Sequence, residues 1–314
     1  MTFVQLEYIV ALDTYRHFAH AANHCFVTQP TLSMQIQKLE ESLGVVLFDR
    51  AKQPIMPTEI GSEIIAQARK ILGERDMVEQ IIQQKKGVLA GEVKLGIIPT
   101  LAPYLLPLFL HQFVLNYPHV KLHINELTTE NIVTQLRDGR LDVGILVTPL
   151  NEVDLKEWPM FYEEMVAYVS TINKAYQKSY VLTSDIDPNK LWLLEEGHCF
   201  RAQIMNLCEL RRGSKDGINF EYEAGSVETL RRMVDVSDGI TILPELATLD
   251  MPETQLDHLR YFKHPAPVRE VSLITHRTYL KTKIIEVLKQ QILDCIPPKL
   301  LKNKKRLVVP IEQV

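Results

Sequence analysis

The sequence predicts an α/β protein with an all-α N-terminal unit, a long connecting helix and a two-lobed domain built around a sheet. Residues 1–58 carry apolar side chains at helical spacing, and residues 59–90 continue one helical pattern without a break. From residue 91 onward, strand-like apolar runs alternate with helical stretches. This alternation is typical of a parallel sheet covered by helices.

The composition indicates a soluble globular protein of the cytoplasm. Hydrophobic residues make up 46% of the chain and charged residues 24%. No apolar run reaches the roughly 20 residues of a membrane span, and the N-terminus lacks the pattern of a secretory signal. The four cysteines, Cys25, Cys199, Cys208 and Cys295, are too few for the disulfide framework of a secreted domain. Free thiols in a reducing compartment are therefore expected.

The N-terminal unit contains three predicted helices, at 3–15, 18–24 and 29–43. Thr28 is the expected N-cap of the third helix, and Gly44 is its expected end. This order, a helix, a short helix, a tight turn and then a helix with one polar face, is that of the helix-turn-helix motif. In that motif the helix after the turn reads base edges.

The side chains expected to contact DNA lie on the third helix and in a short extended pair after it, which would form a wing against phosphates. They are Thr28, Gln29, Pro30, Thr31, Ser33, Gln35 and Lys38 on the helix, and Arg50 in the extended pair. The first 60 residues contain more acidic than basic side chains, so charge alone does not predict DNA binding. Periodicity alone leaves a second interpretation open, a small helical subdomain with a solvated polar face.

The helical pattern of residues 59–90 predicts a helix too long for a small domain to bury. A helix of about 30 residues spans roughly 45 Å. Its apolar stripe is therefore expected to pair with a second copy of the chain. Gly87 and Gly91 mark a hinge after this helix.

Residues 91–161 and 268–300 are expected to form the first lobe of the sheet domain, and residues 162–267 the second, before a tail at 301–314. Two crossovers between α/β lobes are typical of the periplasmic-binding-protein arrangement. The expected strands lie at 93–98, 120–127, 141–147, 165–170, 191–194, 240–243 and 268–275, with a final helix at 281–294. The basic stretch 299–306 is interpreted as a solvated end.

Two threonines stand where a ligand would bind in such a sheet. Thr100 and Thr129 each follow a predicted strand and precede a helix, at the carboxyl edge of the sheet. A role as a plain helix N-cap fits each position about as well.

Two cysteines nine residues apart follow a predicted strand and Gly197. Cys199 is expected to begin a helix, where the helix N-terminus, a protonated His198 and Arg201 would lower the pKa of its thiol. The thiolate attacks peroxide and forms a sulfenic acid, which condenses with a second thiol such as Cys208. The alternative is that both cysteines are small buried apolar side chains.

The spacing of these cysteines predicts a conformational switch. On one continuous helix, Cys199 and Cys208 would be separated by roughly 13 Å, whereas a disulfide requires Cα atoms within about 7 Å. The segment between them would therefore have to unwind before the bond forms. Cys25 and Cys295 have no basic neighbour close in sequence and are interpreted as structural.

Several motifs of the N-terminal unit resemble the signature of LysR-type transcription regulators. They are Ala21-Ala22, Thr28-Gln29-Pro30-Thr31-Leu32-Ser33, Ile36-Gln37-Lys38-Leu39-Glu40, Leu43-Gly44, Leu47-Phe48-Asp49-Arg50 and Thr58-Glu59-Ile60-Gly61. The resemblance implies a winged helix-turn-helix that binds double-stranded promoter DNA, and a linker helix through which homodimers form. It also implies a dimer of dimers that acts on RNA polymerase.

The cysteine segment resembles the peroxide-sensing branch of the same family. The resemblance covers nearly the whole chain and is carried by Gly197-His198-Cys199 with Cys208, by Ile98-Pro99-Thr100 and by Gly239-Ile240-Thr241-Ile242-Leu243-Pro244. It implies that Cys199 is the peroxidatic residue and Cys208 the resolving one. Thr100, Thr129 and His198 would line the peroxide pocket. Hydrogen peroxide would be the signal, and a thiol reductant of the glutaredoxin or thioredoxin type would reset the protein.

Two other functions stay open. A LysR-type regulator controlled by a small metabolite in the cleft between the lobes would leave Cys199 unreactive toward peroxide. A thiol peroxidase would share the thiol chemistry, but the sequence has no dinucleotide or phosphate-binding motif, no Cys-x-x-Cys pair and no metal-ligand spacing. A regulator that is not an enzyme, with no cofactor and no metal, is therefore expected. Ala202 departs from the aspartate common at this position of the peroxide-sensing branch, which bears on the redox set-point.

Overall fold

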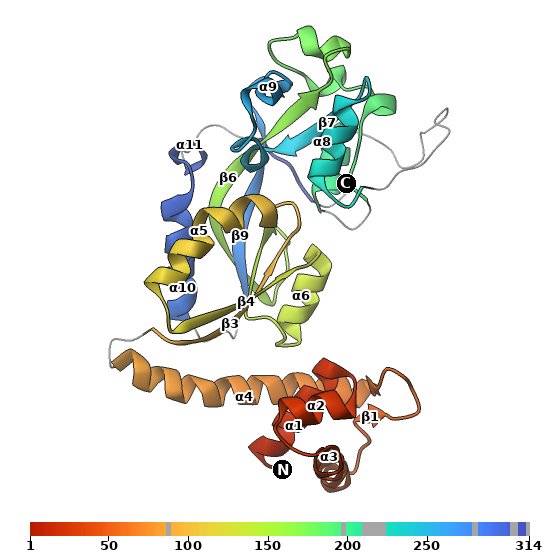
Figure 1. Ribbon diagram of the computed structural model, residues 1–314, viewed down its shortest axis with the longest axis vertical. Coiled ribbons are helices and arrows are strands. Elements are labelled where there is room, and N and C mark those ends of the chain that lie inside the picture. Colours follow the sequence, from red (N-terminus) through yellow and green to blue (C-terminus); the bar gives the residue numbers. More distant parts are fainter. Residues whose placement is uncertain (86–88, 196–198, 209–223, 278–281, 302–306, 312–314) are drawn as a thin grey trace. The chain divides into compact units, whose positions relative to one another are not determined.

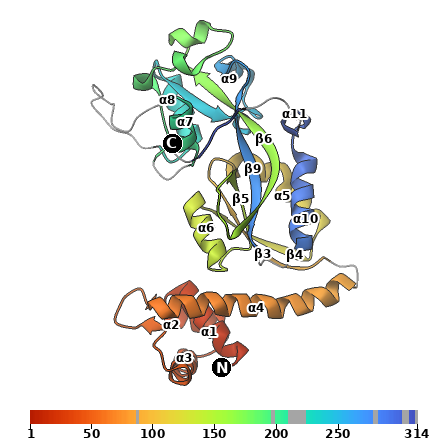
Figure 2. The ribbon, with the colours of Figure 1, turned by 180° about the vertical axis from the view of Figure 1, so that it is seen from behind.

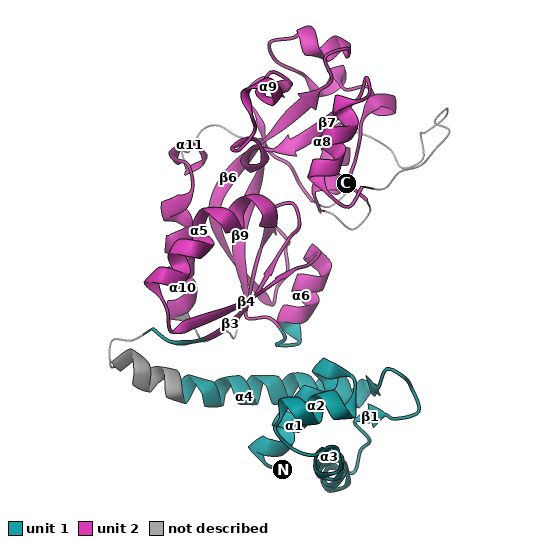
Figure 3. Cartoon of the chain, viewed as in Figure 1, with its two compact units in different colours: residues 1–91, 137–140 teal, residues 92–136, 141–314 magenta. Residues whose placement is uncertain are grey.

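The computed structural model describes residues 1–85, 89–195, 199–208, 224–277, 282–301 and 307–311. The chain forms two compact units, which Figure 3 colours separately. The first comprises residues 1–91 and 137–140, and the second comprises residues 92–136 and 141–314. The finer domain limits expected from the sequence remain a prediction.

The N-terminal unit contains the three predicted helices, followed by a two-stranded wing and a long helix (Figure 1). The elements are α1 (Phe3–Tyr15), α2 (Phe18–His24), α3 (Gln29–Leu43), β1 (Phe48–Asp49), β2 (Met56–Pro57) and α4 (Glu59–Lys85). Thr28 caps α3 by accepting from the Thr31 N–H, and Gly44 ends it in the left-handed region at φ 70°. Local capping signals therefore fixed both ends of α3 as predicted.

A continuous apolar core joins α4 to the helices of this unit. Leu6, Ile9, Leu12, Leu32, Ile36, Leu39, Ile65 and Ala68 are all buried in one cluster. Arg69 of α4 pairs with the buried Asp13 of α1. The first part of α4 is thus anchored to the helix-turn-helix, and α4 continues beyond it.

The second unit is built on an eight-stranded mixed sheet with the order β4-β3-β5-β9-β6-β7. In addition, β10 pairs with β9 and β8 pairs with β6. Its strands are β3 (Gly91–Ile97), β4 (Val120–Glu126), β5 (Val143–Thr148), β6 (Leu155–Val169), β7 (Ile240–Pro244), β8 (Leu259–Tyr261), β9 (Pro267–His276) and β10 (Leu307–Val308). Its α-helices are α5 (Ala102–Asn116), α6 (Thr129–Arg137), α7 (Cys199–Leu207), α8 (Val227–Asp235), α9 (Glu253–Leu256), α10 (Thr282–Cys295) and α11 (Pro298–Leu301), and η1 (Lys174–Gln177), η2 (Thr183–Asp185), η3 (Pro188–Lys190) and η4 (Glu245–Thr248) are short 3-10 turns.

Two long strands connect the lobes of this unit. Figures 1 and 2 show β6 and β9 running side by side from one lobe into the other. β3 and β5 are parallel as predicted, but β9 is antiparallel to both β5 and β6. The expectation of a parallel sheet was therefore incomplete, because a strand that leaves a lobe and the strand that returns to it run in opposite directions.

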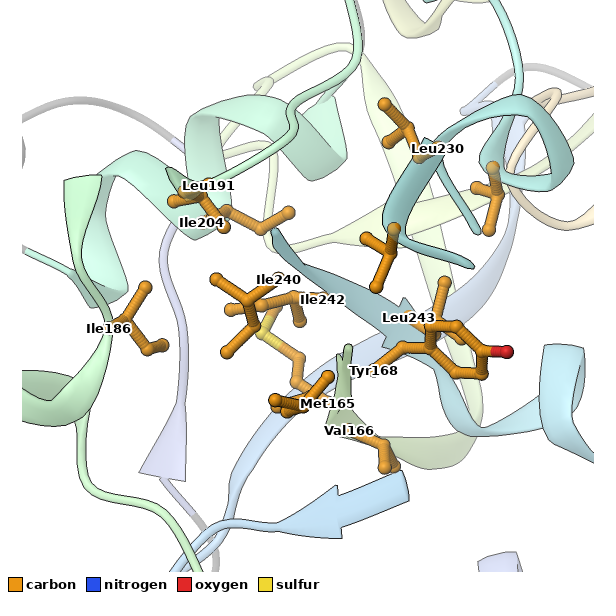
Figure 4. Close-up of a cluster of buried hydrophobic side chains, with 14 of the residues drawn as sticks. Met165, Val166, Tyr168, Ile186, Leu191, Ile204, Leu230, Ile240, Ile242 and Leu243 are labelled. Atoms are coloured by element: carbon orange, nitrogen blue, oxygen red, sulfur yellow. The ribbon is translucent and has the colours of Figure 1, made fainter. Parts of the chain in front are cut away.

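The core of the second lobe gathers side chains from β6, β7, α7 and α8. Figure 4 shows Ile204 of α7 and Leu230 of α8 on either side of Ile240 and Ile242. The strand expected at 191–194 is not formed, because this stretch makes only isolated bridges, from Leu191 to Ile240 and from Leu194 to Ala224. The 3-10 turn η3 immediately precedes this stretch, which does not pair in a continuous register with any strand.

The C-terminal end differs most from expectation. Lys299, interpreted as part of a solvated end, forms an ion pair with Glu245 at 2.7 Å. Residues 302–306 lie outside the described residues. After them, β10 adds to the sheet in parallel with β9, and Val309 is 3% exposed in the core of the second lobe. Of this apolar stretch, only Val309 is buried, because β10 adds to the sheet beside β9, whereas Leu307 and Val308 stay exposed.

Candidate functional site

The two central cysteines occupy opposite ends of α7. Cys199 is its first residue, and the N–H of Cys208 donates to Ile204 O at 3.0 Å as the helix ends. Nine residues of helix separate the two Cα atoms by roughly 13 Å, which is too far for a disulfide. The prediction of one intervening helix is confirmed, and all four cysteines are free.

The Cys199 thiol is enclosed. Its residue is 8% exposed, and burial raises the pKa of the thiol. Thr129, the positive charge of Arg269 and the N–H groups of Phe200 and Cys199 at the helix start all act in the opposite direction and lower the pKa. The expected contribution of the helix start is present, but the expected net lowering of the pKa is wrong because removal from water outweighs it.

Arg269 is the cation of this site, and it comes from β9. Its side chain is fully buried, with Nε donating to Glu163 Oε2 at 2.6 Å. One terminal nitrogen donates to Thr100 Oγ1 at 2.9 Å and the other to Thr100 O at 3.0 Å. Its guanidinium also lies 4.9 Å from the centre of the Phe200 ring. Arg269 therefore links Thr100 to the first turn of α7.

Arg201, the cation expected beside the thiol, serves another purpose. It donates to Leu194 O at 2.7 Å and so connects the first turn of α7 to the chain segment before the helix. Arg269 lies 70 positions after Cys199, and no sequence spacing signals such a contact. The available signal was a charged residue inside an otherwise apolar strand, where an unpaired charge would be very costly.

Glu163 and Arg269 form a cross-strand ion pair between β6 and β9. The two residues are register partners, and both side chains are fully buried. Glu163 also accepts the N–H of Leu246 at 2.6 Å through its other oxygen. Charge-assisted hydrogen bonds satisfy both ions, and this arrangement makes a buried pair tolerable. The pair holds Thr100 at the point where the lobes meet.

The two predicted threonines stand at the ends of neighbouring strands. Thr100 follows β3, is 2% exposed and accepts from Arg269. Thr129 begins α6, and its Oγ1 is buried without a well-formed hydrogen bond among the described residues. Thr128 caps α6 instead, accepting the Asn131 N–H at 3.4 Å. The Thr129 hydroxyl therefore interacts with the Cys199 thiol and lowers its pKa. His198 lies outside the described residues.

Cys208 is also shielded from water in this conformation. Burial raises the pKa of its thiol to about 12. Cys25 packs against the helix-turn-helix core, and burial raises the pKa of its thiol as well. Cys295 accepts from Gln291 Nε2 at 3.6 Å on α10. These contacts fit the structural role expected of Cys25 and Cys295.

The residues expected to contact DNA gather on α3 and the wing. Gln29, Pro30 and Lys38 are exposed, while Thr28 Oγ1 lies 2.8 Å from Thr31 Oγ1. The remaining members are partly engaged within the unit: Ser33 is half-buried, Gln35 accepts from Gln5 at 3.3 Å and Arg50 pairs with Glu40 at 2.7 Å. Arg50 is thus held beside α3, and its contact with phosphate stays a prediction.

Comparison with known families identifies both units. Residues 3–62 match the bacterial regulatory helix-turn-helix protein, lysR family, and residues 86–295 match the LysR substrate binding domain. The chain belongs to the LysR family. The predicted family and the predicted combination of a helix-turn-helix unit with a two-lobed regulatory domain are therefore confirmed.

Individual LysR-family relatives are similar over most of the chain. It is 36% identical to the DNA-binding transcriptional dual regulator OxyR of Escherichia coli, with 87% of this chain and 89% of that protein covered. It is 35% identical to the hydrogen peroxide-inducible genes activator of Haemophilus influenzae, with 87% and 90% covered. A cysteine-to-aspartate variant of full-length OxyR from Pseudomonas aeruginosa matches the fold with a TM-score of 0.80 at 34% identity, over 94% of this chain and 99% of that one.

The described helices and acidic or sulfur-containing side chains carry no membrane span and no metal cluster. None of the helices within the described ranges has the length and apolar character needed to cross a bilayer. Among the same residues, no cluster of His, Cys, Asp and Glu has the composition of a metal site.

Proposed function

We propose that this LysR-family chain is a DNA-binding transcription regulator that senses hydrogen peroxide through Cys199. The observation that carries the proposal is a buried thiol at the start of α7 that interacts with the charge of Arg269 and with the hydroxyl of Thr129. A second thiol, Cys208, stands at the other end of the same helix. The similarity to OxyR and to a hydrogen peroxide-inducible activator supports the same function.

The chemistry uses two balanced steps. The Cys199 thiolate attacks one peroxide oxygen, and the O–O bond breaks to give a sulfenic acid and a hydroxide that takes up a proton to become water. Thr100 and Thr129 can donate hydrogen bonds to peroxide and to its leaving oxygen, and His198 is proposed as the third group lining the pocket. The thiolate of Cys208 then attacks the sulfenic sulfur, a disulfide forms and hydroxide leaves as water.

The disulfide changes the shape of the second lobe because α7 must unwind before the two sulfurs can meet. In a homodimer, or a dimer of dimers, this change would alter subunit geometry and hence the contacts with promoter DNA and RNA polymerase. A thiol reductant of the glutaredoxin or thioredoxin type would restore the thiols. We place this cycle in the cytoplasm, where such a reductant and the operator are both present.

Peptide mapping tests the proposal. Treatment with a slight excess of hydrogen peroxide is expected to remove two hydrogens from the intact mass and to join the peptides of Cys199 and Cys208. Cys199→Ser should abolish both this bond and any peroxide-induced change in the DNA footprint, while Cys295→Ser, the control, should leave them intact. A peroxide response that survives in Cys199→Ser would refute the sensing role and would favour a metabolite in the cleft as the signal.

Substitutions on α3, the proposed recognition helix, are expected to weaken DNA binding. Gln29→Ala and Ser33→Ala, one turn apart on α3, should each weaken binding to a promoter fragment protected by the wild-type protein. A lost base contact corresponds to about 1–3 kcal/mol, measurable by fluorescence anisotropy at fixed salt. Gln112→Ala, an exposed glutamine of α5, is the matched control. If all three variants bind the fragment with equal affinity, α3 is not the recognition helix.

A further inference from the structure

The last described residues pack directly into the lobe that contains the redox helix. The Leu307 N–H donates to Ala266 O at 3.2 Å, and the Val309 N–H donates to Val268 O at 2.9 Å. Val309 belongs to the same apolar cluster as Ile204 of α7, which Figure 4 shows within the core of this lobe. Residues 307–310 are therefore part of the structure around α7.

Two amide side chains of α7 hold this C-terminal segment by its carbonyl oxygens. Gln203 Nε2 donates to Val309 O at 2.7 Å, and Asn206 Nδ2 donates to Pro310 O at 3.0 Å. Residues three apart on a helix share a face. One face of α7, located between Cys199 and Cys208, is thus bonded to the C-terminal segment.

Gln203 is the more informative of the two, because it is a polar side chain with no exposure to solvent. Its Oε1 has no hydrogen-bond partner among the residues that the structure describes. Burial of an amide is costly unless it forms hydrogen bonds. The bond to Val309 therefore offsets this cost, and it exists only while α7 is helical and the C-terminal segment is in place.

We infer that residues 307–310 are a latch on the redox helix and that Gln203 is a positioning residue that controls disulfide formation. This inference rests on the proposed function. Oxidation of Cys199 to a sulfenic acid requires no movement of α7. Attack by Cys208, with loss of water, requires α7 to unwind and so separates Gln203 from Val309. By linkage, a docked segment restrains unwinding, and an unwound α7 weakens the docking of the segment by the same factor.

A rate measurement on the full-length protein separates the two steps. Gln203→Met keeps the length of the side chain but removes the donor to Val309. Sulfenic acid formation, trapped with dimedone after mixing with peroxide, should stay within about twofold of wild type. Disulfide formation should become roughly tenfold faster, and the reduction potential should fall by about 30 mV, the value of a tenfold change for two electrons.

A control and a second readout exclude a general loss of stability. Gln291→Met changes a side chain of α10 that accepts from Asn116 and donates to Cys295, far along the chain from Cys199 and Cys208, and should leave both rates unchanged. In the wild-type protein, hydrogen exchange at Leu307 and Val309 should be slow before oxidation and faster after it. Exchange in the buried strand β5 should not change.

The outcomes distinguish the latch from the sensor. The latch is refuted if peroxide joins Cys199 to Cys208 while the Val309 amide stays protected from exchange and Gln203→Met forms the disulfide at the wild-type rate. In that case the proposed sensing function is still supported. If the wild-type protein forms no such disulfide, the proposed function fails and the latch fails with it. Faster disulfide formation in Gln203→Met together with exposure of Val309 on oxidation establishes the latch.

Discussion

Replacing Arg269 by methionine is expected to lower the free energy of unfolding of the second unit by about 3–5 kcal/mol, the usual cost of removing one partner of a buried ion pair. Glu163 would be left as an uncompensated buried carboxyl, and Thr100 would lose two donors. Burial raises the pKa of Glu163, so this group would take up a proton rather than stay charged.

Urea denaturation followed by tryptophan fluorescence measures this loss, because Trp158 and Trp192 both belong to the second unit. The matched control is Lys121→Met, which breaks an exposed pair with Glu92 and should cost under about 1 kcal/mol. The double variant Glu163→Leu with Arg269→Met should recover much of the stability. Equal midpoints for Arg269→Met and Lys121→Met would contradict the role given to the buried pair.

The same substitution tests the electrostatics of the thiol. Arg269 lowers the pKa of Cys199, so its removal should raise this pKa further and reduce the thiolate present at neutral pH. Alkylation of Cys199 by iodoacetamide in a Cys208→Ser background should therefore be slower in Arg269→Met. The stabilising and chemical roles of Arg269 can be separated because alkylation is measured on protein that is still folded.

Features controlled by local signals could be predicted from the sequence. The ends of α3 followed from Thr28 and Gly44, since capping depends on residues next to the helix end. Placing Thr100 and Thr129 at strand ends followed from the alternation of strands and helices. Cys199 at the start of α7 was also predicted, from Gly197 and from a strand at 191–194 that the structure does not form.

Features controlled by distant contacts could not be predicted. Arg201 is close to Cys199 in sequence, yet it donates to Leu194 O, while Arg269, on a strand 70 positions later, lowers the pKa of the thiol by its charge. The docking of Val309 was missed for the same reason, because a basic stretch before it suggested solvent. Both depend on the pairing of β9, which brings distant residues together without a sequence period.

The rate at which peroxide oxidises Cys199 should rise about tenfold per pH unit from roughly pH 6 to 8. Burial raises the pKa of this thiol above its ordinary value, so the thiol form predominates throughout that range. Below its pKa, the thiolate fraction of an acid increases tenfold for each unit of pH. Because only the thiolate attacks peroxide, the second-order rate constant should follow this fraction over about a hundredfold.

Stopped-flow measurement of sulfenic acid formation in Cys208→Ser gives this profile for one thiol. Thr129→Val removes a hydroxyl that lowers the pKa of Cys199, and should displace the rising part of the profile to higher pH. Thr134→Val, at an exposed position of the same helix, should not displace it. A rate that is already constant below about pH 7 would mean that the helix start and Arg269 outweigh burial, and the thiol would then be ionised at rest.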